Sequence, residues 1–265
     1  FLYCLAMQEG KTPCDQVINI PTTFKVGNGT WTPRTTDRAD WIGKTVTLKW
    51  GLTHSSNNIS AHLMKEYGPA AMIRQMRKLG ISTYLPDAPS LCVGTPEIKV
   101  FDMVAAYNTF PSRGVYVTPI FVTRIEDNNG NLLGEFTNPK REAVSDYTAY
   151  LMANLMQGVV NSGTGVRLRA KYALKGEIAG KTGTTNDQSD GWFIGYTPTL
   201  TAGVWVGAED RQVHFESLSL GGGSNMALPI WGLFMQKVHA DPTLGVSETD
   251  RFVAPPGVTL NLDCD

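Results

Sequence analysis

Residues 177–207 read EIAGKTGTTNDQSDGWFIGYTPTLTAGVWVG, and this stretch carries the clearest strand signals in the chain. Three short apolar runs have the composition of β-strands, and they cover 177–184, 191–196 and 200–207. Turn residues separate them at Asn186-Asp187 and at Thr197-Pro198. Strand-like runs joined by short turns predict three consecutive antiparallel strands.

Segments with helical periodicity precede and follow this predicted sheet in the sequence. Apolar residues recur at helical spacing in the segments 1–9, 52–67, 72–79, 100–110, 145–160 and 225–239. Residues 121–133 read as a hairpin around Asn128-Asn129-Gly130, and residues 19–50 read as a long ordered connection. This order predicts an α+β fold, an antiparallel β-sheet flanked by helices with a helical lobe beside it and a cleft between the two lobes. We expect one domain over 1–240 and a C-terminal extension over 241–265 that packs on the domain or leaves it.

Composition excludes several classes of protein. The 265 residues include 23 Lys plus Arg and 24 Asp plus Glu, so the formal charge of −1 disfavours a nucleic-acid binder. No run approaches 18 uninterrupted apolar residues, which a membrane-spanning helix would need. Four cysteines are too few for a disulfide framework and lack metal-ligand spacing: Cys4, Cys14, Cys92 and Cys264. His214 and His239 are isolated, so we expect no metal and no cofactor.

A lysine between glycines lies on the first predicted strand, in Ala179-Gly180-Lys181-Thr182-Gly183-Thr184-Thr185. The glycines permit close approach of another backbone, the lysine supplies a fixed positive charge, and the hydroxyls supply hydrogen bonds. Together they form a receptor for the carboxylate of an extended peptide. The simpler interpretation is a surface strand with a solvated lysine, and a three-residue match alone does not decide between them.

A second motif, His54-Ser55-Ser56-Asn57-Asn58, falls in a predicted helical region. A serine hydroxyl and an asparagine amide two residues later can move a proton and hold a substrate amide. The alternative is ordinary helix capping, for which both residue types are favoured. The spacing occurs in two registers, Ser55 with Asn57 and Ser56 with Asn58.

These motifs, with their order, resemble the transpeptidase domain of penicillin-binding proteins, most closely the class A type that also carries a glycosyltransferase domain. The resemblance covers nearly the whole chain. Its remaining segments are Pro89–Gly94, Ala105-Ala106-Tyr107, Gly163-Thr164-Gly165 and Asp190-Gly191-Trp192-Phe193. The family's Leu-x-x-Ser-x-Asn framing, present as Leu52 to Asn57, selects the register of Ser55 and Asn57.

The resemblance implies a role for each matching residue. Ser55 would relay a proton to the leaving amine, and Asn57 would bind the substrate amide. Lys181, Thr182, Gly183 and Thr184 would bind the terminal carboxylate, and the Thr184 N–H would supply half of the oxyanion hole. The substrates implied are D-Ala-D-Ala stem peptides of peptidoglycan and β-lactam antibiotics, at the extracytoplasmic face of a bacterial envelope. The parent protein would be anchored in the membrane, with cell-wall synthesis proteins as partners.

One departure from the family is central. The family's nucleophile belongs to a Ser-x-x-Lys motif, and no serine here has a lysine three places later. A hydroxyl residue has that spacing at Thr22 and Lys25, in a segment without helical pattern. The resemblance implies that the motif opens the helix continuing through Phe1-Leu2-Tyr3, so the serine is expected about five residues before Phe1. The apolar start also lacks an initiator Met, so the chain is expected to be part of a longer protein, inactive as it stands.

Two rival functions remain. A DD-carboxypeptidase or serine β-lactamase shares these motifs and passes the acyl group to water, although no deacylation base is identifiable here. A non-catalytic binding module could keep the fold without the chemistry. A Ser-x-x-Lys in the residues that precede Phe1 in the gene would favour the enzyme.

Overall fold

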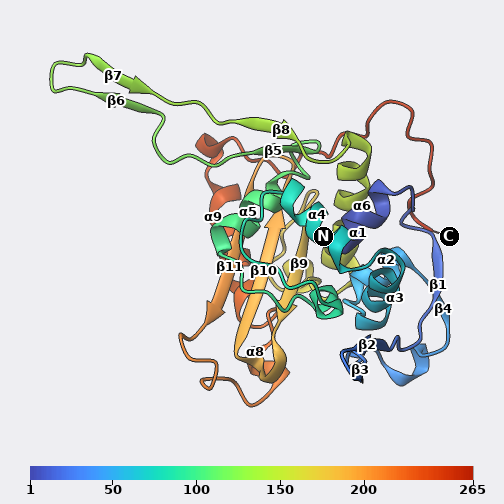
Figure 1. Ribbon diagram of the computed structural model, residues 1–265. Coiled ribbons are helices and arrows are strands. Elements are labelled where there is room, and N and C mark those ends of the chain that lie inside the picture. The colour runs from blue at the N-terminus through green and yellow to red at the C-terminus, as the bar shows by residue number, and fades with distance from the viewer. Residues whose placement is uncertain (265) are drawn as a thin grey trace.

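The computed structural model describes residues 1–264 as a helical lobe beside a three-stranded sheet, with a hairpin arm projecting from one end (Figure 1). Five helices form most of the lobe: α1 (Leu2–Gln8), α2 (Leu48–Thr53), α3 (Asn57–Tyr67), α4 (Pro69–Lys78) and α6 (Asp146–Ser162). The longest of them, α6, begins at Ser145, whose hydroxyl accepts from the Thr148 N–H at 3.1 Å. Serine is favoured at this position, because its hydroxyl satisfies a backbone donor that the helix cannot pair.

The sheet has the predicted antiparallel order. Its strands are β9 (Ala179–Thr184), β10 (Asp190–Tyr196) and β11 (Thr201–Gly207), in the order β11-β10-β9. Lys181 pairs with Ile194 of β10, and Trp192 pairs with Trp205 of β11. Strand β9 is therefore an edge strand, and Lys181 lies in its middle.

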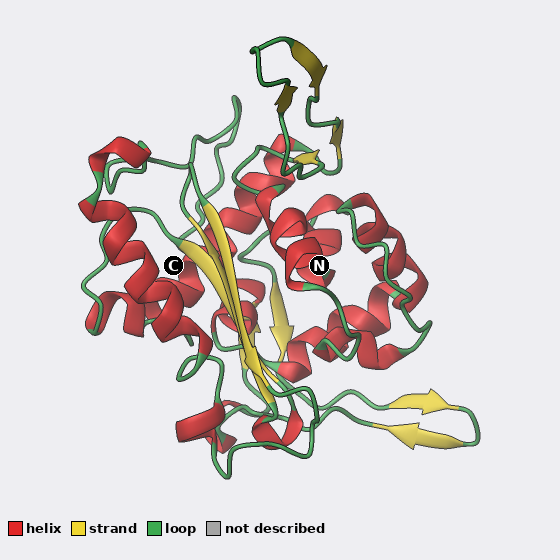
Figure 2. Cartoon of the chain, turned by 90° about the vertical axis from the view of Figure 1, so that its left-hand side faces the viewer, coloured by secondary structure: helices red, strands yellow, loops and turns green. Residues whose placement is uncertain are grey.

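Helices cover both faces of this sheet because the apolar side chains of β10 alternate between them (Figure 2). Phe193 meets Trp231 of α9 (Ala227–Ala240) edge to face, with ring centroids 5.2 Å apart. On the other face Tyr196 approaches Phe110, just after α5 (Val100–Asn108), and joins the core of the helical lobe. The α+β architecture inferred from the sequence is confirmed.

The predicted helix over 52–67 is wrong in one respect, because the structure divides it into α2 and α3. Ser55 lies between them in the left-handed region, with φ of 56°. Ser56 then caps α3 by accepting from the Ile59 N–H. Because a capping serine adopts an extended backbone, it starts a new helix rather than continuing the old one. The break turns Ser55 out of the helix.

Short elements fill the connections that the sequence pattern did not resolve. Ladders of three residue pairs each join β1 to β4, β2 to β3, β5 to β8, and β6 to β7. Their bounds are β1 (Gln16–Ile18), β2 (Phe24–Val26), β3 (Gly29–Trp31), β4 (Thr45–Thr47), β5 (Val115–Val117), β6 (Arg124–Glu126), β7 (Leu132–Glu135) and β8 (Lys140–Glu142). Short helices are α7 (Arg167–Ala170) and α8 (Leu218–Gly221), with 3-10 turns at Ala39–Trp41, Pro89–Val93, Asn186–Gln188 and Pro242–Leu244. The predicted hairpin is the projecting arm β6–β7 (Figure 1).

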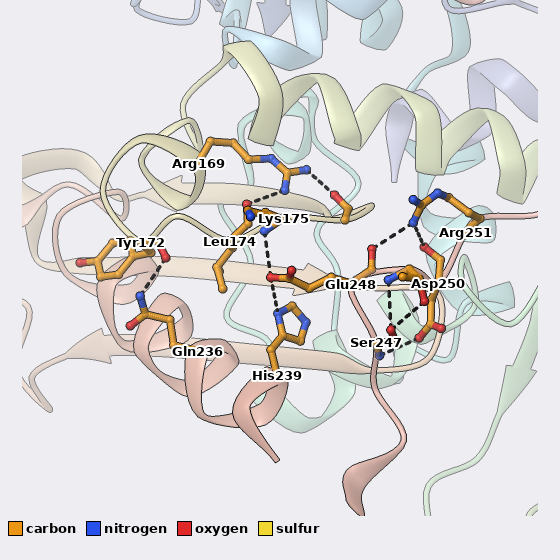
Figure 3. A network of polar contacts seen from close by, with 12 residues as sticks. Arg169, Tyr172, Leu174, Lys175, Gln236, His239, Ser247, Glu248, Asp250 and Arg251 are labelled. Carbon is orange, nitrogen blue, oxygen red and sulfur yellow. Dashed lines mark hydrogen bonds and ion pairs between the residues drawn. The ribbon is translucent and has the colours of Figure 1, made fainter. Parts of the chain in front are cut away.

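The C-terminal segment lies against the loop that leads into β9 (Figure 3). Glu248 accepts from the Lys175 N–H at 3.3 Å, and its carboxylate lies 3.4 Å from His239 of α9. Gly176 has φ of 72°, and a side chain there would meet the Glu248 carbonyl oxygen at 2.5 Å. Arg169 donates to two carbonyls of the same loop. These contacts attach the segment to the base of the lysine-bearing strand.

Cys14 and Cys264 form a disulfide, which the cysteine count did not predict. They are 250 residues apart, and they meet because the C-terminal segment returns to the helical lobe, where the Lys49 ammonium donates to the Leu262 carbonyl at 2.6 Å. Spacing along the chain cannot show such a return. Cys4 and Cys92 are free. Within residues 1–264, no helix combines the length and apolarity needed to cross a bilayer.

Replacing both linked cysteines, in Cys14→Ser with Cys264→Ser, should lower the free energy of unfolding by about 2–4 kcal/mol. The link closes a long loop, so it restricts the unfolded chain. Urea unfolding of the oxidised protein measures the difference, with Cys92→Ser as the matched control that removes an unlinked thiol. Equal stability of the double variant and the parent would contradict the expectation.

Candidate active site

Lys181 and Ser55 meet although 126 residues separate them. The Lys181 Nζ donates to the Ser55 Oγ at 2.7 Å and to the Thr182 carbonyl oxygen at 2.8 Å. Lys181 comes from the middle of β9 and Ser55 from the turn between α2 and α3. The fold therefore brings the two sequence motifs into direct hydrogen-bond contact.

The two possible registers of the second motif have different surroundings. Ser56 is buried and donates to the Asp37 carboxylate at 2.6 Å, and Asn58 is buried and donates to Asn19 at 2.8 Å. Ser55 is only partly buried and faces the lysine. Ser56 and Asn58 thus anchor the turn, which leaves Ser55 available for chemistry.

Asn57 does not join Lys181 in any contact that the structure shows. Its side-chain amide donates to the Arg34 carbonyl at 2.8 Å, in the segment between β3 and α2. It is partly exposed and is the first residue of α3. The structure therefore places Asn57 two residues from Ser55 with its amide held by a neighbouring loop.

Burial shapes the electrostatics of the lysine. Desolvation lowers the pKa of Lys181 from 10.5 to about 8, because a charged ammonium loses hydration between β9 and the helical lobe. Burial also lowers the pKa of the Phe1 α-amino group, and the like charge of Lys181 lowers this pKa further. The first residue before α1 thus lies within electrostatic range of the lysine. A proton at this junction can be exchanged near neutral pH more readily than on an ordinary lysine.

The threonines of the same strand are held by other segments. The Thr182 hydroxyl lies 2.7 Å from that of Thr164, and the Thr184 hydroxyl accepts from the Gly223 N–H at 2.9 Å. Because Gly223 fills an acceptor position on Thr184, the Thr184 proton remains free to donate to an anion. Thr184 itself is exposed.

The glycines beside Lys181 are close to groups of this chain. A side chain at Gly180 would meet the Phe193 ring at 2.8 Å, and one at Gly183 would meet Trp192 at 3.2 Å. A side chain at Gly223 would meet the Gly183 carbonyl oxygen at 2.2 Å. Part of the space that these glycines leave open is therefore occupied by neighbouring strands and loops of the same chain.

The other groups named from the sequence lie away from this junction. His214 is in an exposed loop, and His239 faces Glu248. Within the described part of the chain, no three His, Cys, Asp or Glu side chains gather as a metal site would require. Thr22, which precedes Lys25 of β2 by three residues, does not stand in a helix, and the same holds for Thr137 before Lys140 of β8, a match that sequence reasoning overlooked. Cavities of about 330 Å³ and 290 Å³ lie elsewhere and are lined by neither Ser55 nor Lys181.

Sequence reasoning missed two residues that hold the site together. Asp37 anchors Ser56, and nothing in its own sequence context marks it. Thr164 contacts Thr182, and although the segment Gly163-Thr164-Gly165 belongs to the resemblance, nothing in the sequence assigned Thr164 a role. Both act across long stretches of chain.

Comparisons with known proteins agree on one family. The family model described as penicillin binding protein transpeptidase domain matches residues 1–212. Penicillin-binding protein 1A of Aquifex aeolicus is 31% identical over 233 residues, covering 88% of this chain and 30% of that protein. Penicillin-binding protein 2D of Bacillus subtilis is 31% identical over 265 residues, covering 97% of this chain and 37% of that protein. The chain thus spans about a third of the length of these relatives.

A solved structure supports the fold. Penicillin-binding protein 1A from Haemophilus influenzae superposes with a TM-score of 0.83 at 20% identity, covering 97% of this chain and 42% of that chain. The PonA1 protein from Mycobacterium tuberculosis, solved in complex with penicillin V, gives a TM-score of 0.74 at 24% identity and covers 95% of this chain and 69% of its own.

Protein stability should depend on the titration of Lys181. The unfolded chain has the ordinary lysine pKa, so between pH 8 and 10.5 it binds more protons than the folded chain, and the free energy of unfolding should rise with pH across this window. The free energy of unfolding should rise by on the order of 2–3 kcal/mol across this window. Urea unfolding of the parent and of Lys181→Met isolates this rise, because the other titrating groups cancel in the difference. A difference that stays constant from pH 7 to 10.5 would contradict the burial of the ammonium.

Proposed function

The chain belongs to the penicillin-binding protein transpeptidase family, and from this premise we propose that it forms most of a D,D-transpeptidase site that cross-links peptidoglycan stem peptides. The observation that carries the proposal is the 2.7 Å contact between the Lys181 ammonium and the Ser55 hydroxyl, at the junction of the sheet and the helical lobe. A partly desolvated cation hydrogen-bonded to a hydroxyl is suited to proton transfer and to binding a carboxylate.

The proposed reaction has two acyl transfers. A serine hydroxyl attacks the carbonyl carbon of the penultimate D-Ala and loses its proton to a neighbouring base, and the C–N bond to the terminal D-Ala breaks. Ser55 relays a proton to the leaving amine, so D-alanine departs as a neutral amine and an acyl-enzyme remains. The amine of a second stem peptide then attacks the ester, gives up a proton along the same path, and releases the serine.

The lysine-bearing strand is proposed to bind the end of the donor peptide. Lys181 supplies positive charge, and Thr182 and Thr184 offer hydroxyl protons to the terminal carboxylate. Gly183 leaves the strand edge without a side chain, so the peptide can lie along it. Thr184 is supported in this role by its exposure and by the Gly223 contact that leaves its proton free. Its backbone N–H is proposed as one oxyanion donor, and Asn57 as a ligand of the substrate amide.

The nucleophile is proposed to lie before Phe1, in a Ser-x-x-Lys motif that the 265 residues do not contain. The influence of the Lys181 charge on the pKa of the Phe1 α-amino group supports this, because it places the start of α1 within electrostatic range of the lysine. We therefore propose that residues 1–265 alone are not acylated. Because its proposed substrate, peptidoglycan, lies outside the cytoplasmic membrane, we propose that the enzyme acts at the extracytoplasmic face of the bacterial envelope, with its parent protein anchored to the cytoplasmic membrane.

A fluorescent penicillin should distinguish residues 1–265 from a protein extended at its N-terminus. Residues 1–265 should give no covalent label, whereas a protein extended by about thirty residues before Phe1 should be labelled one to one, because only the latter carries the attacking hydroxyl. Gel fluorescence and intact mass measure both. Labelling of residues 1–265 would overturn the placement of the nucleophile.

The same experiment separates the rival functions. A label that persists for hours in the extended protein is expected of a transpeptidase without an efficient deacylation base. Rapid loss of the label with release of hydrolysed penicillin would identify a β-lactamase-like hydrolase instead. A folded extended protein that is never labelled would support a non-catalytic module.

A further inference from the structure

The segment Gly163-Thr164-Gly165 lies where α6 ends, between the helix that leads to Ser55 and the strand that carries Lys181. The Thr164 N–H donates to the Thr53 carbonyl at 3.3 Å, at the last residue of α2. The Thr164 hydroxyl lies 2.7 Å from the Thr182 hydroxyl on β9. One residue therefore contacts both elements of the site, through its backbone on one side and its side chain on the other.

Backbone proximity explains the glycine before this threonine. A side chain at Gly163 would meet the Thr53 carbonyl oxygen at 2.2 Å, so any other residue would push α6 away from α2. A side chain at Gly158, one turn earlier, would meet the Thr53 hydroxyl at 2.5 Å. The end of α6 is thus packed directly on the backbone that precedes Ser55, with only His54 between Thr53 and Ser55.

On the strand side, Thr182 connects Thr164 to the lysine. Its carbonyl oxygen accepts from the Lys181 Nζ at 2.8 Å, and its hydroxyl pairs with that of Thr164. Fixing Thr182 therefore fixes both β9 and the second acceptor of the ammonium. Two hydroxyls that pair use one proton between them, so the other proton stays free for a substrate anion.

We propose that Thr164 is a positioning residue that sets the separation between the Ser55 turn and Lys181. It acts through the two hydrogen bonds to Thr53 and Thr182 and is not itself part of the proton path. Its effect on acylation rests on the proposed function, whereas its effect on the Ser55–Lys181 contact does not.

Without the Thr164 hydroxyl, β9 loses its polar link to the end of α6, and the ammonium becomes free to move away from Ser55 into water. A more hydrated ammonium keeps its proton to higher pH. A threonine with a purely structural role would change unfolding but leave the Lys181 titration unchanged.

The test compares Thr164→Val, which keeps the shape and the N–H, with Thr164→Ser, which keeps the hydroxyl. Carbon-13 NMR follows the Lys181 Cε signal against pH in residues 1–265, with the Phe1 α-amino group, a second cation near this junction, titrated in the same spectra. We expect the Lys181 midpoint to rise by about 0.5–1 pH unit in Thr164→Val and to return in Thr164→Ser. Thr23→Val is the matched control, since Thr23 pairs with the Thr32 hydroxyl at 2.8 Å far along the chain from either motif.

A second arm measures acylation by penicillin in the extended protein. Thr164→Val should lower the acylation rate constant about 10- to 100-fold, as a small misplacement of reacting groups does, with recovery in Thr164→Ser. If the extended parent is not labelled, the proposed function fails, but the Lys181 titration measured by NMR still tests the positioning role of Thr164. If the parent is labelled and Thr164→Val matches it, the inference fails alone.

Further outcomes are decisive in the same way. An unchanged Lys181 midpoint in Thr164→Val, or an equal shift in Thr23→Val, would overturn the positioning role. If Thr164→Val does not fold, Thr164→Ala replaces it in both arms. Failure of both to fold would also overturn the inference, because Thr164 would then be a folding residue.

Discussion

The hydrogen bond from Lys181 to Ser55 depends on two parts of the chain that fold by different patterns. Lys181 stands on a strand whose position is set by alternating apolar residues, and Ser55 stands in a left-handed turn between two helices. Both ends must be held within a few tenths of an ångström for the 2.7 Å contact to persist. The cost is the desolvation of the ammonium, which lowers its pKa to about 8, and the surrounding packing must offset that cost.

The helical lobe and the sheet meet along α6. The position of this helix therefore determines how Ser55 and Lys181 lie relative to each other. Its N-terminus is capped by Ser145, and its C-terminus contacts the end of α2 directly because Gly163 has no side chain. Buried side chains of α6 belong to the same core as α1 and as Tyr196 of β10. The site therefore depends on buried packing shared by the helical lobe and the sheet. The C-terminal segment adds a second restraint, because Glu248 contacts the loop before β9 and Cys264 is linked to Cys14.

Local pattern was sufficient to predict the larger elements. The three strand-like runs within 177–207 and the helical spacing over 145–160 are set by residues near one another in the sequence, and the structure agrees with both. The turn at Ser55 was not predicted, because apolar residues on both sides keep helical spacing and only the capping geometry of Ser56 reveals the break. Asp37, Thr164 and Cys264 act on partners 19, 18 and 250 residues away. Contacts over such separations depend on the completed fold, which periodicity does not describe.

The measurement that tests the shared site most directly is a double-mutant cycle on penicillin acylation in the extended protein, using Ser55→Ala, Lys181→Met and the pair. Because the two groups touch, their effects on the acylation barrier should be non-additive, with a coupling free energy of about 1–3 kcal/mol. Stopped-flow fluorescence gives the four rate constants, and thermal unfolding checks that each variant is folded. Effects that add within about 0.5 kcal/mol would mean that Ser55 and Lys181 act independently, and would contradict a single site built on their contact.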